Sequence, residues 1–113
     1  MLTIDALRQY GADVDEGLGR CMGKEDFYIK LVNMAINDNS ISRLEEALKS
    51  GDLDTAFDVA HSLKGVLGNL ALTPLCTPVT ELTELLRHKE DADYEKYMDI
   101  IREEYNRLAA LAA

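Results

Sequence analysis

An all-α fold is predicted by three properties of this 113-residue chain. Apolar residues recur at spacings of three and four over most of the sequence, which is the period of amphipathic helices. No stretch alternates β-branched and polar residues with period two, so strands are not expected. Only two prolines and seven glycines interrupt the helical pattern. We therefore expect an antiparallel, up-and-down four-helix bundle with short helical segments at its N-terminus.

The whole chain, residues 1–113, is expected to form a single domain. A chain of this length can bury one hydrophobic core, and no linker or internal repeat divides it. We assign residues 1–22 to N-terminal helical segments that pack on the bundle, and residues 24–110 to the bundle itself.

The N-terminal segments are expected to be two short helices, at 4–10 and near 14–21, and Gly23 separates them from the bundle. From residue 24 to about residue 36, apolar side chains at helical spacing form the first long core-facing stripe. The polar cluster at 37–40 is typical of a turn or helix cap.

A second helix is expected after that turn and should end at Ser50-Gly51. Asp52 is a favourable N-cap for a third helix over 53–70. Thr73 and Pro74 resemble an N-cap followed by a first-turn proline, and they predict the start of the next helix.

Pro78 complicates this next helix because proline cannot donate a hydrogen bond to the carbonyl one turn earlier. The helix therefore either begins only at Thr77 or is distorted at Pro78. A last helix is expected over about 94–108, with Asp91 or Asp93 as its N-cap.

The charge of the chain disfavours two classes of partner. With 21 acidic and 12 basic residues the net charge is −9, which repels nucleic-acid phosphates and anionic lipids. No apolar run approaches the roughly 18 to 20 residues of a membrane span, and residues 1–5 lack the features of a signal peptide. We therefore expect a cytoplasmic protein that binds neither nucleic acid nor membranes.

The two cysteines, Cys21 and Cys76, are far apart in sequence and belong to no CxxC motif or Cys/His cluster. They are expected to be reduced core or boundary residues. No metal or cofactor site of the chain's own is predicted.

One helix carries an unusual polar face around His61. At about 100° per residue, His61 lies roughly opposite the core position Leu63, so its imidazole is expected to be exposed. Lys64 and Gly65 occupy the +3 and +4 positions of the same face, and Gly68 extends it. Glycine within an exposed helix costs roughly 0.5 to 1 kcal/mol relative to alanine, which suggests that something approaches this face closely.

These residues suit phosphoryl chemistry that depends on a partner. An exposed imidazole is a competent nucleophile near neutral pH, and Lys64 could neutralise part of an added phosphoryl charge. The sequence contains no GxxxxGK[ST] loop, no kinase glycine loop and no clustered carboxylates for Mg²⁺. The partner would have to supply the electrophile and the metal.

The run His61-Ser62-Leu63-Lys64-Gly65, followed by Gly68-Asn69-Leu70, resembles the signature of histidine-containing phosphotransfer (HPt) domains of multistep two-component phosphorelays. The similarity extends over nearly the whole chain, including residues 10–14 and 44–52. The sequence departs from the family pattern at Val66, Leu67 and Ala71. The departures at Val66 and Leu67 affect local packing and partner choice more than chemistry.

The resemblance implies a four-helix bundle in which His61 accepts a phosphoryl group from a receiver-domain aspartate and passes it to another receiver. Lys64 would be its basic neighbour and Gly65 its clearance position. The chain would be a monomeric phosphoryl carrier without kinase activity of its own. Its partners would be response-regulator receiver domains and a hybrid sensor kinase, and Mg²⁺ would belong to the receiver.

Phe57 and Asp58 complete the surface on which a partner is expected to bind, together with the two glycines. Phe57 could anchor a partner or could instead wrap onto the N-terminal segment. His88 is expected to be only a helix-end cation, and Tyr94, Tyr97 and Tyr105 to be core or boundary aromatics.

A rival function uses the same surface without chemistry. The chain could be a noncatalytic helical adaptor that binds through Phe57, Gly65 and Gly68, with His61 incidental. A related alternative is a degenerate module that binds receiver domains without accepting phosphate.

Overall fold

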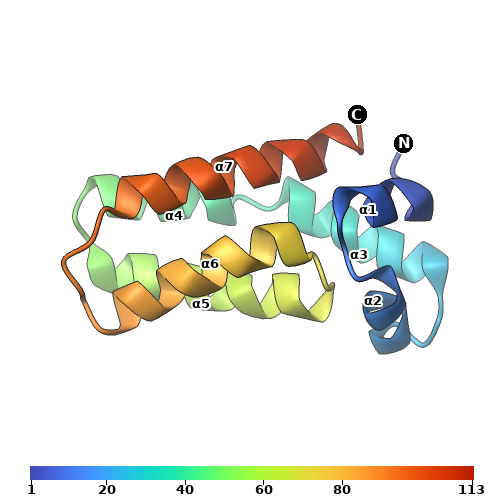
Figure 1. Ribbon diagram of the computed structural model, residues 1–113, viewed down its shortest axis with the longest axis horizontal. Helices are drawn as coiled ribbons and strands as arrows, with labels where there is room; N and C mark the ends of the chain where they lie inside the picture. Colours follow the sequence, from blue (N-terminus) through green and yellow to red (C-terminus); the bar gives the residue numbers. More distant parts are fainter.

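The computed structural model describes residues 1–113, which form seven α-helices and no strand, so the all-α class is confirmed (Figure 1). The helices are α1 (Ile4–Tyr10), α2 (Val14–Arg20), α3 (Glu25–Asn37), α4 (Ser40–Lys49), α5 (Leu53–Asn69), α6 (Thr73–Arg87) and α7 (Tyr94–Ala110).

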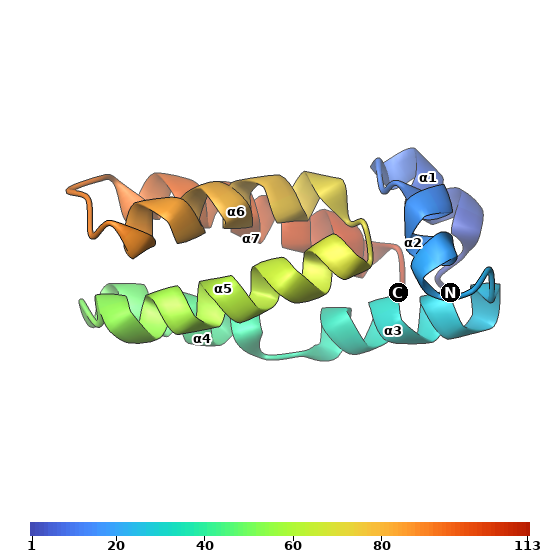
Figure 2. The same ribbon diagram turned by 90° about the horizontal axis from the view of Figure 1, so that it is seen from below.

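The molecule is an elongated body of about 41 × 25 × 19 Å. Helices α3 and α4 lie end to end along one edge, with a short break between them (Figure 2). Helices α5, α6 and α7 pack beside α4, and from α4 onward each helix runs opposite to the one before it. The short helices α1 and α2 gather at one end, where both chain termini also lie.

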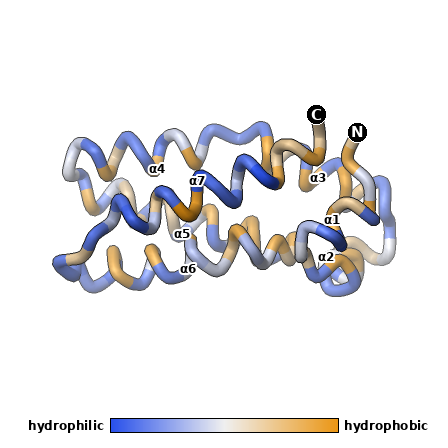
Figure 3. Tube along the Cα trace, turned by 45° about the horizontal axis from the view of Figure 1, so that its top comes forward, coloured by the Kyte–Doolittle hydropathy of each residue, from blue (hydrophilic) through white to orange (hydrophobic).

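The core lies between the long helices, along which hydrophobic and hydrophilic residues alternate (Figure 3). The apolar stripe of α5, which contains the predicted core position Leu63, is buried and joins the buried stripes of its neighbours. The apolar residues Leu75, Val79, Leu82 and Leu86 of α6 are buried as well. The three tyrosines of α7 are half-buried against the core, as expected. Cys21 is buried, Cys76 is half-buried and both thiols are free.

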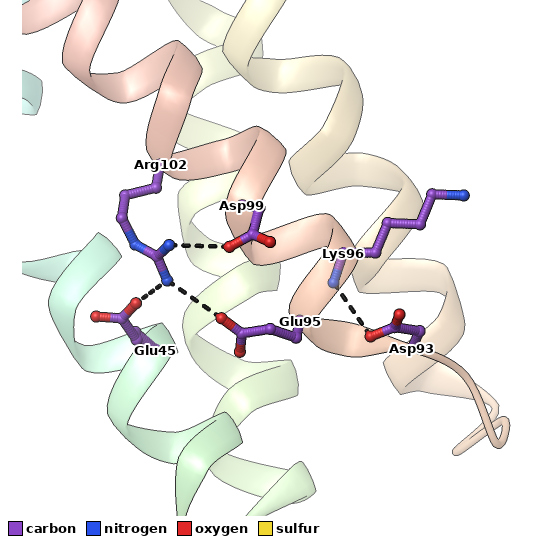
Figure 4. Close-up of polar contacts among 6 residues, drawn as sticks. All are labelled: Glu45, Asp93, Glu95, Lys96, Asp99 and Arg102. Atoms are coloured by element: carbon purple, nitrogen blue, oxygen red, sulfur yellow. Dashed lines mark hydrogen bonds and ion pairs between the residues drawn. The ribbon is translucent and has the colours of Figure 1, made fainter.

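Four helices begin at a side-chain cap that accepts a backbone N–H in the first turn, as Thr3 does for α1 and Asp13 for α2. Asp52 caps α5 as predicted, accepting from Thr55 at 3.1 Å. Of the two candidates for the last helix, Asp93 is the cap and accepts from Lys96 N–H at 3.2 Å (Figure 4).

The predicted start of α6 is wrong by one residue. Leu72, not Thr73, is the N-cap, and its carbonyl accepts the N–H groups of Leu75 and Cys76. Leu72 is fully buried in the core. Its burial fixes the backbone at the end of the turn, and the helix already includes Thr73. The helix then continues through the buried Pro78, so the alternative start at Thr77 is wrong.

The C-terminal end of α5 is tied to α3 by a buried hydrogen bond. The Tyr28 hydroxyl donates to the Leu70 carbonyl at 2.8 Å. Burial raises the pKa of Tyr28 to about 12, so the hydroxyl keeps its proton and remains a donor at neutral pH. Gly17 of α2 lies directly against this pair.

Two further contacts connect the N-terminal helices to the same end of α5. The Asp13 N–H donates to the Ala71 carbonyl at 2.9 Å, and the Arg20 guanidinium donates to the Asn69 side chain at 3.3 Å. The helix that carries His61 is therefore held at its far end by α2 and α3. None of the seven helices combines the length and the apolar character needed to cross a bilayer.

Candidate functional site

His61 lies near the middle of α5 with an exposed side chain, as predicted from its position opposite Leu63. Leu63 is buried in the core, and Ala60 immediately before His61 is buried too. Because these neighbours fix the orientation of the helix, the imidazole is held on the outer surface.

The ring of Phe57, one turn before His61, stacks on the imidazole. The ring centroids are 5.6 Å apart and the planes differ by 19°, which is an offset-stacked arrangement. Phe57 is half-buried, and α1 and α2 lie at the opposite end of the molecule (Figure 1). The alternative that Phe57 wraps onto the N-terminal segment is therefore wrong.

Arg87, at the end of α6, covers the same aromatic ring. Its guanidinium carbon lies 5.0 Å from the centroid of Phe57, within the range of a cation–π contact. Its Nε lies 3.5 Å from Oε2 of Glu84. The other carboxylate oxygen of Glu84, Oε1, lies 4.0 Å from Nζ of Lys64 on α5.

These contacts form one cluster across the α5–α6 pair, which we call the histidine cluster: Phe57, His61, Lys64, Glu84 and Arg87. Sequence reasoning identified its three α5 members and missed its two α6 members. A signal was available for Arg87 alone, because antiparallel helices joined by a short turn bring together residues at equal distances from that turn. Phe57 and Arg87 are equally distant in sequence from Leu72.

The two glycines predicted to open this face have different surroundings. Gly65 is exposed, and a Cβ added there would meet no atom within 4 Å. Gly68 is half-buried, and its Cβ would lie 4.0 Å from Sγ of Cys76 on α6. The open space is therefore at Gly65, beside His61 and one turn after it. Asp58 is exposed on the same face and forms no ion pair.

His88 lies elsewhere, at the C-cap of α6, and is exposed. It has no stacked aromatic ring, unlike His61. No group of three or more His, Cys, Asp or Glu side chains is placed to hold a metal ion.

The fold and the site define a small helical protein with an exposed histidine in a surface cluster that also contains two cations. The family model of the Hpt domain matches residues 37–111, which include α4 to α7 and all of the histidine cluster. The chain therefore belongs to the Hpt domain family, and the resemblance found in the sequence is confirmed. No curated protein and no solved structure matches the chain.

Membership of this family gives the chain a histidine phosphotransfer role in two-component phosphorelays. Hpt domains are phosphocarriers rather than kinases, and their partners are receiver domains. Residues 1–36, which form α1, α2 and nearly all of α3, lie outside the matched range.

Proposed function

We propose that His61 is the phosphoacceptor, which takes a phosphoryl group from a receiver-domain aspartate and passes it to another receiver. The observation that carries this proposal is the exposed, stacked imidazole of His61 beside the open position at Gly65. The chain has one other histidine, His88, and that residue has neither feature.

In the forward step a ring nitrogen of neutral His61 attacks the phosphorus of the receiver's aspartyl phosphate with its lone pair. A P–N bond forms while the P–O bond to the aspartate breaks, and the aspartate leaves as a carboxylate with the bonding electron pair. The other ring nitrogen can then release its proton to water. Transfer to the next receiver reverses these bond changes.

Lys64 is proposed to neutralise part of the phosphoryl charge. A phosphoryl group adds about −1.5 to −2 charges near pH 7, and the ammonium of Lys64 lies on the same face one turn after His61. Lys64 is only one-third exposed, so its charge is less screened than that of a free surface lysine. Mg²⁺ is proposed to belong to the partner receiver domain.

The receiver is proposed to dock over the α5 face formed by Phe57, Asp58, Gly65 and Gly68. The missing side chain at Gly65 leaves room for the rim of the receiver's active site to reach the imidazole. A hybrid sensor kinase would engage the same face through its own receiver domain. We propose that the chain acts as a monomer, so that this face is free for each partner in turn.

The proposal is tested by incubating the chain with a phosphorylated receiver domain and Mg²⁺. The wild type and His88→Gln should gain an acid-labile, base-stable phosphate, and His61→Gln should gain none while keeping the helical circular dichroism of the wild type. Labelling of His61→Gln, or loss of labelling in His88→Gln alone, would overturn the assignment. Equal receiver binding by wild type and His61→Gln with no phosphate in either would favour an adaptor.

A second substitution tests the role of Lys64. Lys64→Ala should slow transfer from the receiver by up to about fivefold, because charge pairs at a protein surface contribute at most about 1 kcal/mol. Its thermal midpoint should change little. Lys96→Ala is the matched control, since Lys96 is an exposed lysine of α7 with no ion pair. Equal rates for the two variants would remove Lys64 from the mechanism.

A further inference from the structure

Glu84 is the only acidic member of the histidine cluster, and it is shared between the two cations. We propose, building on the proposed phosphoacceptor role of His61, that Glu84 competes with the phosphoryl group for Lys64 and Arg87. In the unphosphorylated chain it pairs with both cations. After phosphorylation it releases them to the phosphoryl oxygens and lowers the stability of the phosphohistidine.

The two ion pairs of Glu84 are loose. Their distances of 4.0 Å to Lys64 and 3.5 Å to Arg87 exceed the roughly 2.7 to 3.2 Å of a good hydrogen bond. The side chains are also partly exposed, at 49% for Glu84, 33% for Lys64 and 43% for Arg87. Such contacts cost little to break, so the cations can move when a stronger anion appears.

A second charged cluster in the same molecule shows the opposite arrangement. Arg102 of α7 contacts Asp99 and Glu95 of its own helix at 3.1 and 3.7 Å, and it also binds Glu45 of α4 (Figure 4). One cation is there surrounded by three carboxylates, and it joins two helices. In the histidine cluster one carboxylate is shared by two cations, so positive charge is in excess.

Arg87 is connected to His61 through the ring of Phe57. The guanidinium lies over that ring at 5.0 Å, and the imidazole stacks on it with its centroid 5.6 Å away. Phe57 is therefore a positioning residue that limits the orientations of the imidazole on one side and holds the Arg87 guanidinium over its own ring. A phosphoryl group on His61 would therefore place its negative charge on the ring that stacks against the one covered by this guanidinium.

The charges determine the direction of the effect. A phosphoryl group carries about −1.5 to −2 charges against the single charge of Glu84, so it attracts the two cations more strongly. Loss of the phosphoryl group passes through a loose transition state in which negative charge leaves the phosphoryl oxygens. Cations bound to those oxygens oppose this loss, and Glu84 favours it by drawing the cations away.

The test compares Glu84→Gln with Glu81→Gln in a His88→Gln background, so that His61 is the single histidine. Glu81 is a matched control because it is an exposed glutamate of α6 without an ion pair. Each chain is phosphorylated chemically with phosphoramidate, and the lifetime of the phosphohistidine is followed by ³¹P NMR. The transfer equilibrium with a receiver domain and Mg²⁺ is then measured on the same samples.

We expect Glu84→Gln to lengthen the phosphohistidine lifetime about two- to fivefold and to shift the transfer equilibrium toward the chain by a similar factor. Glu81→Gln should match the background chain. Arg87→Met should shorten the lifetime, and Arg87→Lys should restore part of it because the charge is retained. When Glu84→Gln is added to a chain that already carries Lys64→Ala and Arg87→Met, the phosphohistidine lifetime should not change.

Equal lifetimes for Glu84→Gln and Glu81→Gln would overturn the proposal. A Glu84→Gln effect that persists without Lys64 and Arg87 would also overturn it, since the competition would then not act through these cations. The proposed function fails separately, if receivers do not exchange phosphate with a chain that phosphoramidate does label. In that case the lifetimes still decide the role of Glu84.

Discussion

Gly17 of α2 and Gly65 of α5 are both helical glycines, and their surroundings are opposite. A Cβ at Gly17 would lie 2.5 Å from Cε1 of Tyr28 and 2.9 Å from the Leu70 carbonyl oxygen. A Cβ at Gly65 would meet no atom within 4 Å. Gly17 is thus needed for packing within the chain, whereas no contact within the chain requires Gly65.

The difference separates two reasons for placing glycine in a helix. Gly17 lets α2 approach the Tyr28–Leu70 hydrogen bond, which holds the end of α5. Gly65 lies in the interior of a long helix, where glycine weakens the helix without any internal compensation. Its benefit must therefore come from outside the chain, which supports the proposal that a receiver docks there.

The largest expected effect is at Gly17. Gly17→Ala should lower the free energy of unfolding by about 1 to 3 kcal/mol, because overpacking forces the buried ring or the backbone to move. Tyr28 cannot turn aside without losing its bond to the Leu70 carbonyl. Urea denaturation measures the change. Gly19→Ala is the control on the same helix, since a Cβ there meets no atom within 4 Å.

Equal stability of Gly17→Ala and Gly19→Ala would show that α2 is not closely packed on α3 and α5. Packing within the chain would then not require glycine at position 17.

At Gly65 a smaller effect of opposite sign is expected. Gly65→Ala should raise the free energy of unfolding by roughly 0.5 to 1 kcal/mol, because alanine favours the helix and no clash opposes it. Gly65→Leu should leave the fold intact and slow phosphate transfer from a receiver, because the side chain fills the space beside His61. Denaturation and transfer rates measure the two effects.

The matched control is Gly19→Leu, which adds the same side chain at an open position of α2. If Gly65→Leu transfers phosphate as fast as Gly19→Leu does, the clearance role of Gly65 is wrong.

The smallest expected effect concerns the start of the helix that carries Gly65. The Thr55 hydroxyl and N–H both donate to Asp52, and these hydrogen bonds hold the pKa of its carboxyl below the usual range. Because the folded-state pKa is depressed, this stabilisation is complete above the unfolded pKa of about 3.9 and is lost as pH falls through the folded value. Asp52→Ala should lower the thermal midpoint at pH 7 by about 2 °C.

Melting curves at pH 7 and below pH 3 measure this prediction, and the difference from wild type should shrink at the lower pH. Asp91→Ala is the control, because Asp91 is exposed and caps no helix. A difference that stays constant with pH would assign the effect of Asp52 to something other than its charged carboxylate.

Much of the helical pattern was predictable because it depends on local chemistry. The first helix begins and ends at the predicted residues, and Asp52 caps α5 because its carboxylate can reach the N–H of Thr55. The outward orientation of His61 follows from its position opposite Leu63. The prediction failed at Thr73, where a local cap preference lost to the burial of Leu72.

The all-α class, most helix limits and the exposed face with His61, Lys64 and Gly65 could all be predicted from the order of residues alone. These properties depend on neighbours within about one helical turn, so periodicity and capping are sufficient to predict them. Packing of the helices was needed to bring Glu84 and Arg87 to that face, and to place Gly17 against Tyr28. Those contacts join residues far apart in the chain, and they exist because buried apolar stripes fix how the helices pack.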